Sequence, residues 1–319
     1  MRRYVIRRLL ALVPTLLLAS IIVFSVVRLI PGDVIDLMLI ENDFQSSGLE
    51  SRQALETALG LDQPIHIQYV EWVSSIVTEG DLGRSLWRNT SVVDEIAARL
   101  PVTLQLGFLA LIISLLIAIP IGVVSAVRQE TALDYAGRTF SILALSVPSF
   151  WLGTMVVILP AIWFGWSPPT RIVPFFQDPL ANLATFITPA LVLGAALSAV
   201  TMRMTRSMML EVLRQDYIRT AWAKGLAERK VVVRHALKNA MIPVITLIGL
   251  LFPILFGGTV IIEQIFQLPG LGQLLFDAVS SRDYPIITGV FLVSGLIVIL
   301  VNLAVDLTYG VLDPRVRYD

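Results

Sequence analysis

Cysteine is absent from this chain of 319 residues, and charged residues are scarce. Without cysteine the protein can form no disulfide, use no thiol nucleophile and bind no metal through thiolates. Only 15% of the residues are charged, whereas 56% are hydrophobic and the mean hydropathy is +0.79. A soluble domain of this length carries much more charge, so the composition is typical of a membrane protein with several spans.

Motifs of nucleotide and metal chemistry are also missing from the sequence. It contains no G-x-x-x-x-G-K-[ST] loop, and its only neighbouring glycine and lysine, Lys224 and Gly225, stand in the reverse order. It contains no H-E-x-x-H motif, and its two histidines, His66 and His235, lie far apart. We therefore expect no catalytic, cofactor or metal site, and any uphill transport must take its energy from another chain.

The sequence is dominated by long hydrophobic runs. A helix needs about 20 apolar residues to cross the hydrocarbon core of a bilayer. We predict an all-α membrane protein with six transmembrane helices, at Leu9–Val27, Val102–Val127, Phe140–Phe164, Leu183–Met202, Val244–Ile262 and Ile286–Val305. The first run follows a basic segment and is too long for the apolar part of a signal peptide. Residues 1–30 are therefore expected to form a retained anchor helix.

Basic residues lie mostly on one side of these predicted spans. With the N-terminus inside, the termini and the loops near 128–138 and 203–240 carry seventeen lysines and arginines, against six on the opposite side. Cytoplasmic loops are enriched in basic residues, so we predict that both termini are cytoplasmic. Residues 31–99 then form a small extracytoplasmic region, and residues 100–319 form a five-helix core with a cytoplasmic loop at 204–240.

The extracytoplasmic region is short for an independent fold, so we expect it to pack on the outer ends of the spans. One of its segments has apolar residues at helical spacing, namely Ile67, Val70, Val73 and Val77. The following residues, EGDLGRSL at 79–86, are typical of a turn.

The cytoplasmic loop contains the segment DYIRTAWAKGLAERKVVVRHALKNAMIP, residues 216–243, which holds all three lysines of the chain. Its first apolar residues predict one face of a short helix: Ile218, Ala221, Trp222 and Leu226. Gly225 can end this helix, and Glu228 suits the first turn of a second helix, before Pro243 opens the fifth span. The pattern fits either a basic loop on anionic lipid headgroups or a docking element anchored by Trp222 and Leu226.

Two further segments are candidates for the translocation pathway or its gate. In GLLFPILFGGTVIIEQIF, a helix broken at Pro253, Gly257 or Gly258 can line a cavity or act as a hinge, although plain helix packing also explains such residues. The outer loop that begins at Glu263 is amphipathic, with Leu274, Leu275 and Ala278 on one helical face. We expect this loop to turn back toward the spans and cap the pathway; an ordinary surface loop is the alternative.

The segment 216–243 resembles the cytoplasmic signature loop of binding-protein-dependent ABC importer permeases. That loop carries E-A-A, three further residues and a glycine, with a proline downstream. Arg219, Thr220 and Ala221 stand at the E-A-A positions here, and Gly225 stands at the glycine position. The missing glutamate departs from the general pattern. YIRTAWAKGL followed by RHALKNAMIP instead resembles the variant of the dipeptide, oligopeptide and nickel branch.

Other blocks in the same order extend this resemblance over most of the chain. They are LGLDQPIHIQYVEW, GDLGRSL, RLPVTLQL, IEQIFQLPGLGQLLFDAVSSRDYPIITG and NLAVDLTYGVLDPRVR. The long outer segment between the first two spans resembles the B-type permease of this branch.

The resemblance implies a type I ABC importer permease fold in a bacterial or archaeal plasma membrane. It implies coupling to an ATPase through these residues: Arg219, Thr220, Ala221, Trp222, Lys224, Gly225 and Leu226. The implied partners are membrane lipid, a second homologous permease, two ATPase subunits that bind ATP and Mg, and an extracytoplasmic substrate-binding protein. The implied substrate is a peptide, and no nucleic acid is involved.

Two other classes of function remain open from the residues. An ion-coupled secondary transporter or a channel for small solutes needs no ATPase, but such a carrier usually keeps an intramembrane carboxylate. Here Asn302 and Asp306 lie close to the cytoplasmic boundary, where interhelical hydrogen bonds explain them. A membrane-embedded hydrolase needs a nucleophile and a base, and Ser149 and His235 belong to different depths of the predicted topology.

The charge asymmetry predicts the result of a labelling experiment in intact cells. Because the chain has no cysteine, one introduced cysteine reports only on its own position. A cysteine within Pro31–Arg99 should react with an impermeant maleimide, whereas a cysteine at Lys224 or Lys230 should react only after the membrane is opened. Labelling of position 224 from outside would contradict the predicted orientation.

Overall fold

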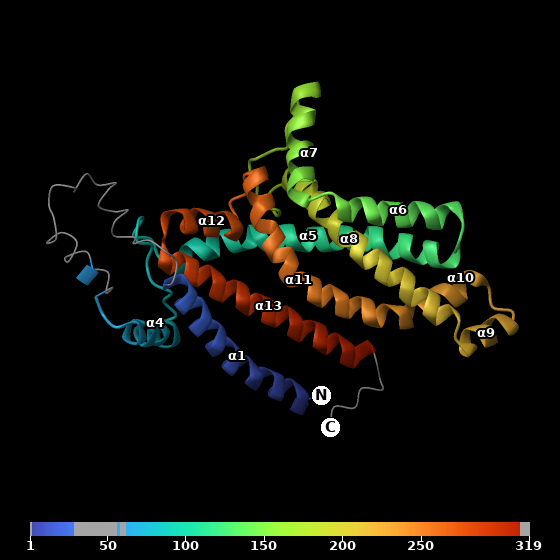
Figure 1. The fold of residues 1–319 in the computed structure, drawn as a ribbon, viewed down its shortest axis with the longest axis horizontal. Helices are drawn as coiled ribbons and strands as arrows, with labels where there is room; N and C mark the ends of the chain where they lie inside the picture. The colour runs from blue at the N-terminus through green and yellow to red at the C-terminus, as the bar shows by residue number, and fades with distance from the viewer. Residues whose placement is uncertain (1, 29–55, 58–61, 313–319) are drawn as a thin grey trace. The chain divides into compact units, whose positions relative to one another are not determined.

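The computed structural model describes residues 2–28, 56–57 and 62–312, and leaves out the side chains of residues 2–9 and 306–312. The outer segments 31–55 and 58–61, the C-terminal residues 313–319 and the side chain of Asp306 therefore lie outside the described part. Within that part the protein is helical, apart from turns and one isolated bridge between Arg84 and Ser91 (Figure 1). The helices are α1 (Arg2–Arg28), α4 (Ile65–Glu79), α5 (Val92–Val127), α6 (Ala132–Ser146), α7 (Ser149–Phe164), α8 (Pro179–Leu213), α9 (Asp216–Ala223), α10 (Glu228–Lys230), the π-helix η2 (Val231–Leu237), α11 (Lys238–Phe266), α12 (Leu271–Ser281) and α13 (Tyr284–Leu312).

Five helical stretches are long and apolar enough to cross a membrane, and they confirm five of the predicted spans. They are Leu10–Arg28, Val92–Val127, Pro179–Leu213, Glu228–Phe266 and Tyr284–Val305. The pair α6 and α7 gives a sixth span if the two helices are counted together. The predicted all-α architecture is therefore confirmed within the described residues.

The prediction of one continuous helix at Phe140–Phe164 is wrong, because α6 and α7 meet at a bend of 91°. Pro148 has no N–H to donate, and its ring disfavours the helical conformation of the residue before it. Val147 is accordingly extended, with φ −93° and ψ 119°. Apolar composition predicted the presence of this segment in the membrane but could not predict that the helix breaks.

The chain divides into two compact units, each with its own core. Unit 1 comprises residues 1–5, 103–268 and 300–319, and unit 2 comprises residues 6–102 and 269–299. In unit 1, α8 packs against both α6 and α11, and it also approaches α5 closely. A Cβ on Gly194 of α8 would lie 2.9 Å from the carbonyl oxygen of Ala110 on α5, so a larger residue would force these helices apart.

A buried ion pair joins α6 to α8 in unit 1, and a serine of α5 adds a hydrogen bond to it. Asp134 on α6 is fully buried, and its two carboxylate oxygens accept hydrogen bonds from Nε and Nη2 of Arg206 on α8, at 2.8 Å and 2.9 Å. Ser125 on α5 also donates to Asp134, and Arg138 Nη2 lies 3.3 Å from its Oδ2. This bidentate geometry fixes the register of α6 against α8. No pattern in the sequence indicated that Asp134 and Arg206 pair.

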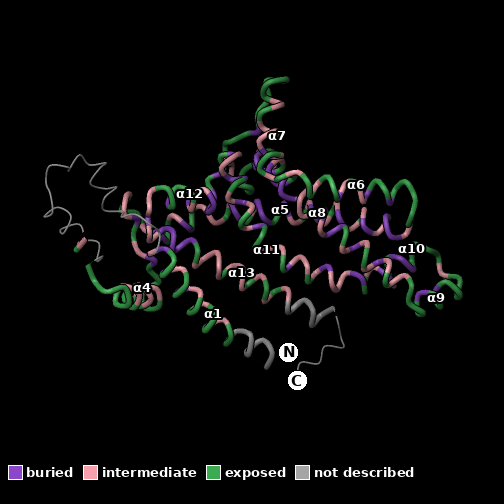
Figure 2. The backbone as a smooth tube through the Cα atoms, viewed as in Figure 1, coloured by how far each residue is buried: buried purple, intermediate pink, exposed green. Residues whose placement is uncertain are grey.

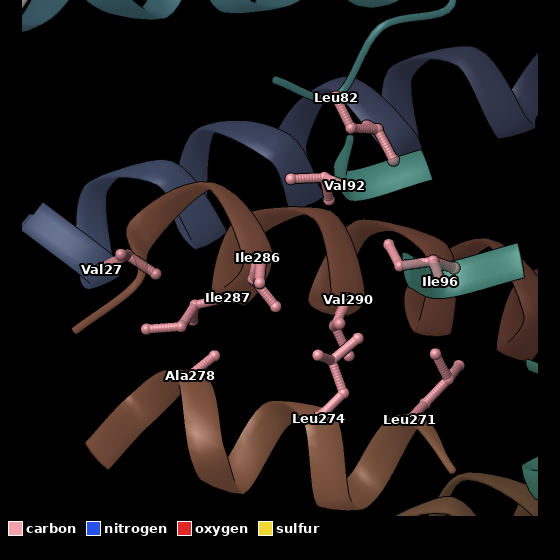
Figure 3. Packing of buried hydrophobic residues seen from close by; sticks show 10 residues of the cluster. All are labelled: Val27, Leu82, Val92, Ile96, Leu271, Leu274, Ala278, Ile286, Ile287 and Val290. Carbon is pink, nitrogen blue, oxygen red and sulfur yellow. The ribbon is translucent and has the colours of Figure 1, made fainter. Parts of the chain in front are cut away.

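The core of unit 2 joins α1, the start of α5, α12 and α13. Figure 3 shows Leu271, Leu274 and Ala278 of α12 pointing toward α13. Polar contacts hold the turn after α4 to the same core: Ser85 Oγ donates to Asp283 Oδ2 at 2.5 Å, and Trp87 Nε1 donates to the carbonyl oxygen of Ser281 at 2.8 Å. The described end of the predicted outer region thus packs on helices, as expected.

The helix predicted around Ile67 is present as α4 (Ile65–Glu79), and aromatic residues beside the predicted valines pack against α1. Val70 and Val77 are 63% and 78% exposed. Tyr69 and Trp72 instead pack around Phe24 of α1, with ring centroids 5.4 Å and 5.6 Å from the Phe24 ring. Aromatic side chains bury more area than valines, so they take the side that faces the protein.

The buried ion pair predicts a large loss of stability on substitution. Asp134→Ala leaves the guanidinium of Arg206 without its bidentate partner, which should destabilise the protein on the order of 3 kcal/mol. Asp216→Ala is the matched control, because the Asp216–Arg219 pair on α9 is exposed and should contribute little. Thermal unfolding of the purified protein in detergent measures both. Equal melting temperatures for the two variants would contradict a structural role for Asp134.

Candidate coupling segment and gate residues

The predicted short helix of the cytoplasmic loop is α9, and its two sides differ sharply in burial. Ile218 is fully buried and Ala221 is 7% exposed, whereas Trp222 is 43% exposed. Within this chain, Ile218 and Ala221 of the predicted apolar face are therefore covered, whereas Trp222 is not. Successive residues of a helix differ by about 100° in direction, so the residue after buried Ala221 points away from the contact. Figure 2 shows this mixture of buried and exposed positions along α9.

Gly225 ends α9 through a Schellman motif, as the sequence predicted for a glycine at this place. The N–H of Gly225 donates to the carbonyl oxygen of Trp222 at 2.8 Å, and the N–H of Leu226 donates to that of Ala221 at 3.4 Å. Gly225 has φ +76°, a left-handed conformation, and a Cβ there would meet no atom within 4 Å. The glycine is needed for its backbone conformation and not for close approach.

An apolar cluster fastens α9 to the helices around it in unit 1. This loop cluster contains Ala126, Met209, Ile218, Ala221, Val231, Val232, Ala236 and Ala240. Its members come from α5, α8, α9, η2 and α11, and Leu226 packs against it while remaining partly exposed. Leu226 therefore supports the turn from within. Trp222 and Tyr217, 43% and 44% exposed, are large side chains that α9 leaves uncovered.

The remaining predicted coupling residues are polar and exposed. Lys224 and Thr220 are exposed. Arg219 Nη1 lies 3.4 Å from Asp216 Oδ1 in an exposed pair. One contact that the sequence analysis missed is the hydrogen bond from Asn239 Nδ2 of α11 to the hydroxyl of Tyr217, at 2.8 Å. Two polar side chains 22 positions apart gave no signal of this pairing.

The second predicted helix begins at Glu228, as expected, but Pro243 does not open the next span. α10, η2 and α11 follow one another without a break in helical structure, and Pro243 lies inside α11. Proline removes one backbone hydrogen bond but is tolerated in membrane helices when neighbours support the backbone. The same reasoning applies to Pro253, since α11 continues through Pro253, Gly257 and Gly258 to Phe266. The helix break considered there does not occur.

The candidate gate residues of α11 separate into two environments. Leu250 and Ile254 are 66% and 65% exposed, and Pro253 is exposed beside them. A Cβ on Gly257 would meet open space, whereas one on Gly258 would lie 3.4 Å from Leu193. Gly257 therefore belongs to an uncovered face of α11, and Gly258 faces α8.

Glu263, near the end of α11, is fully buried and does not line an open surface. Thr103 Oγ1 of α5 donates to Glu263 Oε1 at 2.7 Å. The main-chain carbonyl of Glu263 accepts from the N–H of Leu268 at 2.9 Å, which closes the helix end. Glu263 thus links α5 to α11 within unit 1.

Leu274 and Leu275 lie on α12, in unit 2. Leu274 is 1% exposed, and Leu275 is partly buried against the same core. The helical face predicted for Leu274, Leu275 and Ala278 is present in α12. Its action as a gate stays a prediction.

Two family models match the chain. The model described as binding-protein-dependent transport system inner membrane component matches residues 118–318. A second model, for the N-terminal part of such membrane components, matches residues 1–107.

Curated relatives match over their whole length. A putative peptide transport system permease protein of Brucella abortus (strain 2308) is 41% identical over 319 residues, which are 100% of both chains. The oligopeptide transport system permease protein AppB of Bacillus subtilis (strain 168) is 40% identical over 321 residues, and the glutathione transport system permease protein GsiC of Salmonella typhi is 40% identical over 319 residues. Each also covers 100% of both chains.

A solved structure shows the same fold. The crystal structure of an amino acid ABC transporter with histidines matches with a TM-score of 0.51 at 15% identity, over 70% of this chain and 95% of that chain. At this identity the likeness shows only the fold, which is that of a type I permease. Together with the family models and the full-length relatives, it shows that the chain belongs to the family of binding-protein-dependent transport system inner membrane components, the permease subunits of ABC importers.

Proposed function

We propose that this permease subunit imports peptides and that α9 couples it to a cytoplasmic ATPase. The observation that carries the coupling proposal is the half-exposed Trp222, presented by a helix whose opposite side is packed into the loop cluster. Aromatic side chains at the centre of an interface often contribute about 2 kcal/mol or more to binding. Exposed Arg219, Thr220 and Lys224 are polar neighbours of this anchor in the sequence.

Transmission from α9 to the membrane helices follows from how α9 is attached. A helix of eight residues is not stable by itself in water, so α9 depends on the loop cluster for its structure. The cluster connects it to α5, α8, η2 and α11. A partner that moves α9 therefore moves these helices with it. ATP and Mg bound by two ATPase subunits supply the energy, and the helices alternate between outward and inward opening.

The translocation pathway forms between this chain and a second, homologous permease. The uncovered side of α11, with Leu250, Ile254, Gly257 and Ile261 at helical spacing, supports this part of the proposal. A substrate-binding protein delivers the solute from outside, and the described residues 62–99 of the outer region, with α12, form a surface that receives it. Gate residues are proposed in each unit separately: Glu263 at the end of α11, and Leu274 with Leu275 on α12.

The peptide substrate is inferred from relatives that match over their whole length. Their names specify peptide, oligopeptide and glutathione transport. All three are compounds with amide bonds, so we assign this class to the present chain. The chain itself performs no covalent chemistry, and both of its termini lie in the cytoplasm of a bacterial or archaeal cell.

An ion-coupled transporter is the rival function. Within the described part of the chain, the fully buried carboxylates Asp134 and Glu263 accept hydrogen bonds from side chains of neighbouring helices. Such engaged groups suit a structural role better than reversible ion binding. Dependence of uptake on ATPase subunits separates the two functions.

Gly225 should be required for coupling because of where its left-handed turn lies. Gly225→Val introduces strain of about 1–2 kcal/mol without a steric clash. Gly165→Val is the matched control, since Gly165 ends α7 with φ +63° and also has nothing within 4 Å of its Cβ position. We expect Gly225→Val alone to lower peptide-stimulated ATP hydrolysis in proteoliposomes, by about tenfold. Equal losses from both variants would show that strain, and not position, causes the defect.

Trp222→Ala should weaken docking of the ATPase without affecting membrane insertion. Loss of an aromatic anchor predicts at least about a tenfold reduction in ATPase retained on purification, and a parallel loss of peptide uptake. Trp151→Ala is the control, because Trp151 on α7 has a similar exposure of 50%. Arg219→Ala and Lys224→Ala should have smaller effects, since exposed rim charges are screened. Full retention and coupled uptake in Trp222→Ala would refute the assignment.

A further inference from the structure

A cavity of about 230 Å³ lies in unit 2, between the end of α1, one side of α4 and the start of α13. One water molecule takes about 30 Å³ of liquid volume, so the cavity can hold a small polar group of several atoms. The coupling and gating residues proposed above do not line it. Its chemistry comes mainly from Arg28, Glu71 and Trp72.

Arg28 brings to this cavity a positive charge that no carboxylate among the described residues pairs with. Its guanidinium lies over two rings, 5.3 Å from the centroid of Phe24 and 5.4 Å from that of Tyr284. Ring faces attract a cation, but a ring face below the guanidinium does not accept hydrogen bonds from the N–H groups in the guanidinium plane. Across residues 2–28, 56–57 and 62–312, Arg28 forms no hydrogen bond or ion pair. A partly buried guanidinium of this kind is best satisfied by an oxyanion.

A carboxylate and a further hydrogen-bond donor, from Glu71 and Trp72, line the same cavity. Glu71 lies on its wall, and no ion pair joins Glu71 to Arg28 in the described part of the chain. The buried indole N–H of Trp72 has no acceptor among the described residues. A buried donor without an acceptor costs free energy that a ligand can recover. One cavity thus offers separated positive and negative groups, as a zwitterionic ligand requires.

The position of the cavity on α1 indicates contact with lipid. The apolar helical stretch Leu10–Arg28 ends at the cavity, and its residues Ile22 and Val26 are 52% and 56% exposed. The hydroxyls of Tyr69 and Ser20, 2.8 Å apart, tie α4 to α1 about two turns before Arg28.

α4 itself has the character of a helix in the membrane interface. The rest of the protein covers only part of the apolar side of α4, since Val70 and Val77 are largely exposed. Its aromatic residues Tyr69 and Trp72 suit the level of the lipid headgroups. Exposed apolar residues on both α1 and α4 therefore flank a charged cavity at the end of a membrane span.

We propose that this cavity binds the headgroup of an aminophospholipid of the phosphatidylethanolamine class. Arg28, aided by Trp72, holds the phosphate diester, Glu71 accepts hydrogen bonds from the ammonium group, and the acyl chains run along the exposed face of α1. In the proposed topology this lipid belongs to the outer leaflet. A free phosphate or a peptide zwitterion shares part of this chemistry, but neither has acyl chains to cover Ile22 and Val26.

Lipid retention measured by native mass spectrometry on the assembled transporter tests the proposal. The complex is purified in detergent and incubated with phosphatidylethanolamine or phosphatidylcholine of identical acyl chains. We expect the wild type to retain more phosphatidylethanolamine, because a quaternary ammonium cannot donate to Glu71. Arg28→Gln should lower this retention about tenfold. Glu71→Gln should abolish the preference between the two lipids.

Two control substitutions change residues of unit 2 that do not line the cavity. Arg88→Gln removes a partly exposed arginine that lies 3.7 Å from Glu95, and Glu79→Gln changes the last residue of α4. Both should retain lipid as the wild type does. Should Arg28→Gln fail to assemble, Glu71→Gln still decides the question, because Glu71 is exposed at the cavity wall.

Soluble competitors separate a lipid site from other zwitterion or anion sites. O-phosphoethanolamine at high concentration should displace the lipid, whereas inorganic phosphate and a dipeptide should not. Displacement by the dipeptide would assign the cavity to the transported substrate, and displacement by phosphate alone would reduce it to an anion site; either result overturns the proposal. Equal retention of both lipids by the wild type and all four variants also overturns it.

Discussion

The apolar loop cluster beneath α9 is the contact on which the proposed coupling depends. Burying a side chain such as Ile218 or Val231 contributes about 1.5–3 kcal/mol, enough to hold an eight-residue helix that could not form alone. Because the cluster spans α5, α8, η2 and α11, α9 cannot shift without affecting the helices that continue into the membrane. The Schellman turn at Gly225 then directs the chain into α10 and η2, which lead into α11.

Buried polar groups in this chain hold helices together. Asp134 fixes α6 to α8 through Arg206, and Glu263 links α11 to α5 through Thr103. In hydrocarbon an unpaired carboxylate is costly, so such contacts specify which helices pack and in which register. This use of polar groups agrees with a permease that takes its energy from partner subunits. An ion-driven carrier would need groups that exchange their partners during each cycle.

The sequence predicted those features that depend on composition or local spacing. Apolar runs predicted the spans, and Gly225 with Glu228 predicted the helix, turn and second helix. Features that depend on contacts between distant residues were not predictable, such as the pairing of Asp134 with Arg206 or the packing of Tyr69 against Phe24. The outward direction of Trp222 was only partly predictable. Helical spacing places Trp222 beside Ala221, but only packing determines which of the two side chains is covered.

Site-specific cross-linking in the working transporter tests the central claim most directly. A photoactivatable amino acid replaces Trp222 in one complex and Trp151 in another, and both are illuminated in proteoliposomes that contain ATP and peptide. The account predicts that position 222 forms a covalent product with the ATPase subunit, with a yield that changes between ATP-bound and nucleotide-free states, and that position 151 forms none. Cross-linking of position 222 only to lipid would show that α9 is a membrane-surface helix and would contradict the account.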